Sequence, residues 1–244
     1  MSKGTICAIC GERVATTRDH VPPKGIFPKP FPENLITVPA CQLCNNGANQ
    51  ADEQFRTYLS MTIRQDLPEA KNLWKNRSLR TLNKNKKLFR AVSEGLRRAP
   101  AYTDDGVYLG EKPVFLWPAN VYEPIIERIA RGLYYKHYNE VLGSRAACEV
   151  GFLYSLPTEA VQLTRTMSQV QIGEGIFTYR YGRDADKPLN SLWIFEFYLS
   201  HWAYVETKPA NPNKGFNRTR KAPGRQSRAS SVAGPVNPSV MCTD

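Results

Sequence analysis

Two C-x-x-C pairs near the N-terminus constrain the fold of this chain more than any other feature. Cys7 and Cys10 form the first pair, and Cys41 and Cys44 form the second. The two residues between the cysteines of a pair make a tight turn that places both thiolates on one tetrahedral zinc ion. In a chain without a secretory signal, such pairs favour zinc over disulfides. We therefore predict a structural four-thiolate zinc site that pins the intervening segment as a loop or hairpin.

The segment between the two pairs carries a second group of polar residues. It contains Asp19-His20-Val21-Pro22 and then Asn34-Leu35-Ile36, while Asn45 directly follows the last cysteine. Taken together, residues 5 to 65 resemble the HNH endonuclease family, which are the ββα-metal or His-Me finger nucleases, in their zinc-braced form. Because the third motif residue is Asn rather than His, the pattern resembles the H-N-N variant of that family.

The resemblance implies a metal-dependent endonuclease that hydrolyses phosphodiester bonds. His20 has a reference pKa near 6.5, and we expect it to act as the general base that accepts the proton of the attacking water. Asp19 and Asn45 offer a carboxylate and an amide oxygen, which suit a catalytic Mg²⁺ or Mn²⁺ ion. By resemblance alone, Asn34 fixes the loop that aims His20.

Local sequence signals agree with a strand, strand, helix order in residues 1 to 65. Val21 precedes a proline and is therefore biased towards extended backbone, which favours a strand that carries His20. The β-branched run 35–38 suits the second strand. Apolar residues at helical spacing from Phe55 to Ile63 predict an amphipathic helix, with Asp52 as its N-cap.

The charge of the chain points to a polyanionic partner. Its formal net charge is +11 over 244 residues, and the segment from residue 71 to residue 98 holds ten basic residues against one acid, Glu94. We predict that residues 66 to 98 form a basic helical segment that contacts the phosphates of DNA, with RNA as an alternative. The predicted nucleic-acid-binding residues are Arg18, Lys24, Lys71, Lys75, Arg80, Lys84, Lys86 and Lys87.

The rest of the chain carries no recognisable motif. Alternating aromatic residues between Phe177 and Tyr198 predict an antiparallel sheet within an α+β domain at residues 99 to 206. These rings suit core packing better than base stacking. Residues 207 to 244 are rich in Pro, Gly, Ser and Arg, so we expect a disordered basic tail. The whole chain is thus predicted to be an α+β protein.

Other functions remain open at this stage. A zinc-containing nucleic-acid-binding module without catalysis and an RNase both fit the composition. A nuclease with partner subunits in phage defence or a mobile element is a further alternative, by analogy alone. No stretch of about 18 apolar residues suggests a membrane helix, and no signal peptide is recognised, so we expect a cytoplasmic protein.

Overall fold

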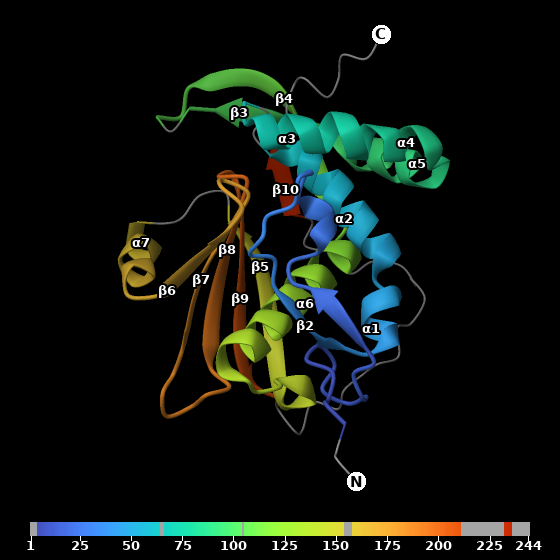
Figure 1. Ribbon diagram of the computed structural model, residues 1–244. Coiled ribbons are helices and arrows are strands. Elements are labelled where there is room, and N and C mark those ends of the chain that lie inside the picture. Colours follow the sequence, from blue (N-terminus) through green and yellow to red (C-terminus); the bar gives the residue numbers. More distant parts are fainter. Residues whose placement is uncertain (1–3, 64–65, 104, 154–157, 211–231, 236–244) are drawn as a thin grey trace, which may run out of the picture.

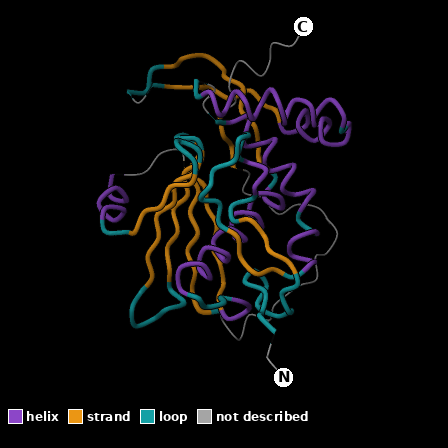
Figure 2. Tube along the Cα trace, in the orientation of Figure 1, coloured by secondary structure: helices purple, strands orange, loops and turns teal. Residues whose placement is uncertain are grey.

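The computed structural model describes residues 4–63, 66–103, 105–153, 158–210 and 232–235. Helices and antiparallel sheets are both present, in agreement with the predicted α+β class. In Figure 2 the five strands of the largest sheet stand on one side, and the helices of the N-terminal half gather on the other. No helix in the described ranges combines the length and the apolar character that crossing a bilayer requires.

The N-terminal part has the predicted strand, strand, helix order. Its elements are β1 (Thr17–His20), η1 (Lys24–Ile26), β2 (Thr37–Ala40), α1 (Gln42–Asn46) and α2 (Asn49–Thr62). The two strands pair antiparallel, with His20 opposite Thr37 and Asp19 opposite Val38. The second strand begins two residues later than predicted. The prediction for Asp52 was wrong, because Ala48 is the N-cap of α2 and Asp52 lies in the first turn.

The basic segment continues the chain as four short helical pieces, which lie across the top of Figure 1: α3 (Pro68–Leu73), η2 (Trp74–Ser78), α4 (Leu79–Lys84) and α5 (Lys86–Gly95). The break between α4 and α5 is at Asn85, whose side chain caps α5 by accepting from the backbone N–H of Leu88 at 3.0 Å. The helical segment ends before residue 98, because strand β3 begins at Leu96 and includes Arg97 and Arg98.

A long hairpin follows, and then the longest helix of the protein's described part. The elements are β3 (Leu96–Tyr102), β4 (Tyr108–Trp117), α6 (Ala119–Tyr138) and η3 (Gly143–Arg145). On its other side β4 pairs with β10 (Val232–Pro235), so the order of this sheet is β10-β4-β3. The predicted disordered tail therefore contains one short strand. Most of that tail lies outside the described residues.

The C-terminal half forms a five-stranded antiparallel sheet in the order β5-β9-β8-β7-β6. Its elements are β5 (Ala146–Leu153), α7 (Thr158–Arg165), β6 (Ser168–Ile172), β7 (Phe177–Arg183), β8 (Ser191–Phe197) and β9 (His201–Pro209). Strand β9 continues two residues beyond the predicted start of the tail at residue 207. Phe177, Tyr179, Trp193, Phe195 and Phe197 are fully buried, so these alternating aromatic residues form core, as predicted.

Buried side chains of the two halves belong to one continuous core. Phe55 of α2 packs against Trp117, Tyr122 and Phe197, with ring centroids 5.6, 6.3 and 5.8 Å away. Helix α6 lies between the N-terminal hairpin and the large sheet and packs against β2, β5 and β9 (Figure 1). The predicted units 1–65 and 99–206 therefore share a core.

Candidate functional site

The four cysteines of the two C-x-x-C pairs meet in one cluster. Cys7 and Cys10 come from the turn before β1, Cys41 is the N-cap of α1, and Cys44 lies within that helix. Their four Sγ atoms lie within 4.8 Å of one another. Four sulfurs on a tetrahedral zinc ion at about 2.3 Å would lie about 3.8 Å apart. The cluster is therefore of the size and chemistry to hold a zinc ion.

A cation borders this cluster on its outer side. Arg13 donates from Nε to Sγ of Cys41 at 3.3 Å and from Nη2 to Sγ of Cys44 at 3.9 Å. A hydrogen bond from Cys44 lowers the pKa of the Cys7 thiol to about 4. Metal-bound sulfur carries negative charge, so Arg13 is placed to offset the charge of a four-thiolate site. The spacing of residues in the sequence did not predict this role for Arg13.

Asp19, on strand β1, is buried, with an exposed fraction of 6%. Its Oδ2 lies 3.8 Å from Nε of Arg128 and has no hydrogen-bond partner. The same Arg128 side chain forms an ion pair with Asp52 of α2. Burial raises the pKa of Asp19, and the charge of Arg128 opposes that rise. Burial likewise raises the pKa of Asp52 to about 6.

His20 lies at the end of β1 and is half-buried. The backbone N–H of the next residue, Val21, donates to the carbonyl of Ile36 at 3.1 Å, which extends the hairpin pairing past His20. Burial lowers the pKa of His20, the nearby Lys24 cation lowers it further, and Asp19 acts in the opposite direction. At neutral pH the imidazole is therefore neutral and able to accept a proton.

Asn45 connects helix α1 to the strand that carries Asp19 and His20. Its amide nitrogen donates to Oγ1 of Thr17 at 3.1 Å and to the carbonyl of Arg18 at 3.0 Å. These bonds use the nitrogen of the amide and leave its oxygen as the free coordinating atom. The carboxylate of Asp19 and the amide oxygen of Asn45 are ligands of the kind that Mg²⁺ and Mn²⁺ accept, but Oδ2 of Asp19 is buried and lies 3.8 Å from the Arg128 cation.

Asn34 lies in the loop between β1 and β2 and bonds to the large sheet. Its amide nitrogen donates to the carbonyl of Gln171, at 2.8 Å, in strand β6 of the large sheet. Asn34 thus fastens the loop between β1 and β2 to the C-terminal half of the protein. The Val21–Ile36 hydrogen bond also holds the backbone next to His20.

The predicted nucleic-acid-binding residues fall into two places. Arg18 and Lys24 are exposed near the hairpin, where Arg18 bonds to Thr37 and Lys24 lies 4.2 Å from the centre of the Phe31 ring. The others are all exposed on α3 to α5 or η2, and none forms an ion pair with a described residue: Lys71, Lys75, Arg80, Lys84, Lys86 and Lys87.

Arg77 and Arg56 do not belong to that solvent-facing set. Arg77 donates to the carbonyls of Gly25 and Phe27 at 3.2 and 3.1 Å. Arg56 donates to Oγ1 of Thr81 at 2.8 Å. Part of the positive charge of this region therefore fastens the basic helices to the loop after His20, and these two residues have a structural role.

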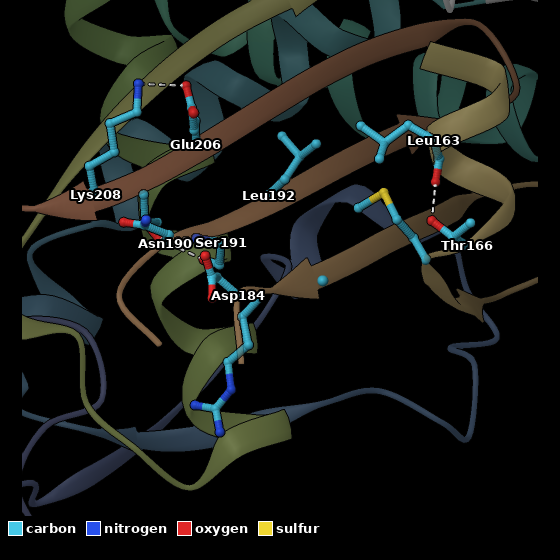
Figure 3. Close-up of a pocket in the computed structure, with 12 residues that line it drawn as sticks. Leu163, Thr166, Asp184, Asn190, Ser191, Leu192, Glu206 and Lys208 are labelled. Atoms are coloured by element: carbon cyan, nitrogen blue, oxygen red, sulfur yellow. Dashed lines mark hydrogen bonds and ion pairs between the residues drawn. The ribbon is translucent and has the colours of Figure 1, made fainter. Parts of the chain in front are cut away.

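A cavity of about 450 Å³ lies away from the motif residues (Figure 3). It is on the outer face of the large sheet, between α7 and the strands β7 to β9. Leu163 and Leu192 line it, together with the ion pair of Glu206 and Lys208 at 3.0 Å. None of the predicted site residues lines this cavity. The candidate site around Asp19, His20 and Asn45 is therefore separate from this cavity.

Comparison with protein-family models, with curated proteins and with solved structures found no match to this chain.

Proposed function

We propose that this chain is a divalent-metal-dependent HNH endonuclease that hydrolyses phosphodiester bonds of DNA, by cleavage or nicking. The observation that carries the proposal is the contact between α1 and β1. Asn45 donates to the carbonyl of Arg18 at 3.0 Å, directly beside Asp19 and His20. This bond supports the proposal because it holds Asn45, a proposed oxygen ligand, against the strand that carries the proposed general base, His20, and the second proposed ligand, Asp19.

Each residue of this group has a separate task. His20 accepts the proton of the attacking water, because its lowered pKa keeps the imidazole neutral. Asp19 and Asn45 would hold the divalent ion through Oδ2 and Oδ1. When bound, the ion supplies positive charge at the leaving oxygen. The zinc site has four thiolates and no open position, so its task is structural.

The exposed cations on α3 to α5 support nucleic acid as the substrate. They carry charge into solvent that no described carboxylate neutralises. Phosphate contacts from such residues supply affinity without reading sequence. DNA is proposed first and RNA is the alternative.

One observation favours a second candidate, a zinc-containing nucleic-acid-binding module without catalysis. Arg128 already places a cation 3.8 Å from Asp19, and Asp19 is almost completely buried. If Asp19 serves only to pair with Arg128, the motif holds the fold together and no catalytic metal binds.

A plasmid cleavage assay with Mg²⁺ separates the two candidates. Wild type should convert supercoiled DNA to nicked or linear forms. His20→Ala should lower the rate by about 10² to 10⁴, the usual contribution of a positioned general base, with little change in DNA affinity. A labelled RNA substrate in parallel distinguishes DNase from RNase activity.

Titration of the metal assigns the remaining roles. Asn45→Ala and Asp19→Ala should raise the Mg²⁺ concentration needed for half-maximal rate, and excess Mn²⁺ should partly restore them. Asn46→Ala, an exposed amide one position along, is the matched control and should behave as wild type. If wild type binds DNA but hydrolyses neither DNA nor RNA, the nuclease proposal is wrong and the second candidate, a nucleic-acid-binding module without catalysis, replaces it. Restoration of His20→Ala by high metal would reverse the assigned roles.

A further inference from the structure

A second cleft lies beside the β1–β2 hairpin. Its volume is about 260 Å³, and it runs between the hairpin and the C-terminal end of α6. Arg18 and Thr37 line it from the strands, and Tyr135, Lys136 and Asn139 line it from the helix end. Apart from Arg18, none of these residues was predicted from the sequence to belong to a functional site.

The lining of this cleft is cationic and polar, and it includes no carboxylate. Two other cavities in the described ranges contain cations whose charge is already paired. In the outer cavity Glu206 holds Lys208 at 3.0 Å, and in a cavity beside Cys10 Glu127 holds Arg131 at 2.7 Å. Neither Arg18 nor Lys136 has an ion pair with a described residue. The cleft is thus suited to an anion.

The arginine of the cleft is held in place before any ligand binds. Arg18 donates from Nε to Oγ1 of Thr37 at 3.0 Å and from Nη2 to the carbonyl of Thr37 at 3.2 Å. These bonds fix the plane of the guanidinium and leave Nη1 as the donor that remains. Holding the side chain in advance lowers the entropy lost on binding.

Strand geometry places this cleft beside the proposed general base. Alternate residues of a strand point to the same face, so Arg18 and His20 share one face of β1, about 6.6 Å apart along the strand. Thr37 is the residue paired directly with His20 across the hairpin. His20 does not line the cleft, but an anion bound by Arg18 would lie on the face of the hairpin that carries His20.

We infer that the cleft binds a backbone phosphate of the substrate, adjacent to the phosphate at which hydrolysis occurs. This inference rests on the proposed nuclease function and adds a contact from α6 to it. Lys136 supplies charge, Arg18 supplies a fixed donor, and the amide of Asn139 and the hydroxyl of Tyr135 are available for further hydrogen bonds. A lysine in the last turn of a helix also interacts favourably with the helix dipole and so stabilises the folded protein. The test must therefore measure phosphate contact and not stability.

The test measures DNA affinity against salt concentration in the full chain carrying His20→Ala, so that the DNA stays intact. Adding Lys136→Ala should lower the slope of log affinity against log salt by about 0.9, the value for one lost phosphate contact. Lys136→Arg should keep the slope. Lys208→Ala is the matched control, because Glu206 already pairs with that lysine.

Duplexes with a single uncharged methylphosphonate locate the contact. At one position next to the cleavage point, the methylphosphonate should weaken the binding of DNA to the His20→Ala protein. It should not weaken the binding of DNA to the His20→Ala/Lys136→Ala protein. If Lys136→Ala keeps the full salt slope and loses affinity at the same positions as its parent, the inference about the cleft is wrong. That outcome is distinct from failure of the nuclease proposal, which would be seen as a wild-type protein that binds DNA and hydrolyses no nucleic acid.

Discussion

The N-terminal hairpin and the C-terminal sheet are stabilised in different ways. The hairpin has two strands of four residues each, and a two-stranded hairpin alone is marginally stable in water. Its ends are held by four clustered thiols. The five-stranded sheet instead buries aromatic rings such as Phe195 and Trp193 completely. The candidate site therefore lies on a hairpin whose stability depends on groups outside its own two strands.

Helix α6 compensates for that weakness. Arg128 reaches Asp19 and Asp52 in the N-terminal half, and Gly132 lies against Val21, where a Cβ atom would come within 2.5 Å of the valine side chain. The hairpin is therefore supported on one end by the cysteine cluster and along one side by a helix of the other half.

The largest effect is expected from the metal. Cys41→Ser should release zinc and unfold the N-terminal hairpin, because structural zinc contributes about 10–16 kcal/mol of apparent binding free energy in small modules. Zinc content by elemental analysis and hydrogen exchange of residues 5 to 63 measure this. The five-stranded sheet should keep its protection, since its core is aromatic.

Cys148→Ser is the control for that experiment. Cys148 lies on β5, outside the cluster, and should leave the zinc content unchanged. Native protection of the hairpin in Cys41→Ser, or a protein free of zinc as isolated, would rule out the four-thiolate site.

A smaller effect is expected where the two halves join. Arg128→Ala leaves the buried carboxylate of Asp19 and the half-buried carboxylate of Asp52 without their cation, which should cost about 3–5 kcal/mol in the free energy of unfolding. Urea denaturation measures the loss. Arg145→Ala, an exposed arginine just beyond α6, should change stability by no more than about 0.5 kcal/mol.

The double variant Arg128→Met/Asp52→Asn sharpens that result. Removing the charges together should recover part of the stability, because less uncompensated charge stays buried. If Arg128→Ala is as stable as Arg145→Ala, the contact does not support the hairpin.

The smallest effect concerns the C-terminal half and pH. His201 is buried among rings, with its Nε2 3.2 Å from the hydroxyl of Tyr122, and burial lowers its pKa from 6.5 to about 3. Between pH 6.5 and pH 3 this histidine is protonated in the unfolded chain but neutral in the folded chain. The free energy of unfolding therefore falls as pH falls below about 6.5. The slope is at most about 1.4 kcal/mol per pH unit.

Denaturation at pH 7 and pH 5 compares wild type with His201→Gln. Wild type should lose up to about 2 kcal/mol more than the variant over that interval. Equal losses would show that His201 is protonated in the folded protein or is not buried in solution.

The accuracy of the sequence predictions depended on the range of the interactions involved. The strand, strand, helix order, the cysteine cluster and the aromatic core follow from spacing and alternation, which act over a few residues. The boundaries were less accurate. Strand β3 begins at Leu96 inside the predicted helical segment, since pairing with β4 outweighs local helix propensity. The start of the tail was wrong for a similar reason, because β9 continues to Pro209 by pairing with β5.

The sequence by itself determined which chemical groups are present and which of them are near one another along the chain: four thiols in two pairs, an Asp-His dipeptide and an amide after the last cysteine. Only the tertiary structure decided what surrounds them. Arg128 lies more than one hundred residues from Asp19, and Gln171 is 137 residues from Asn34. No local pattern encodes such contacts, because packing of α6 and the large sheet against the hairpin creates them.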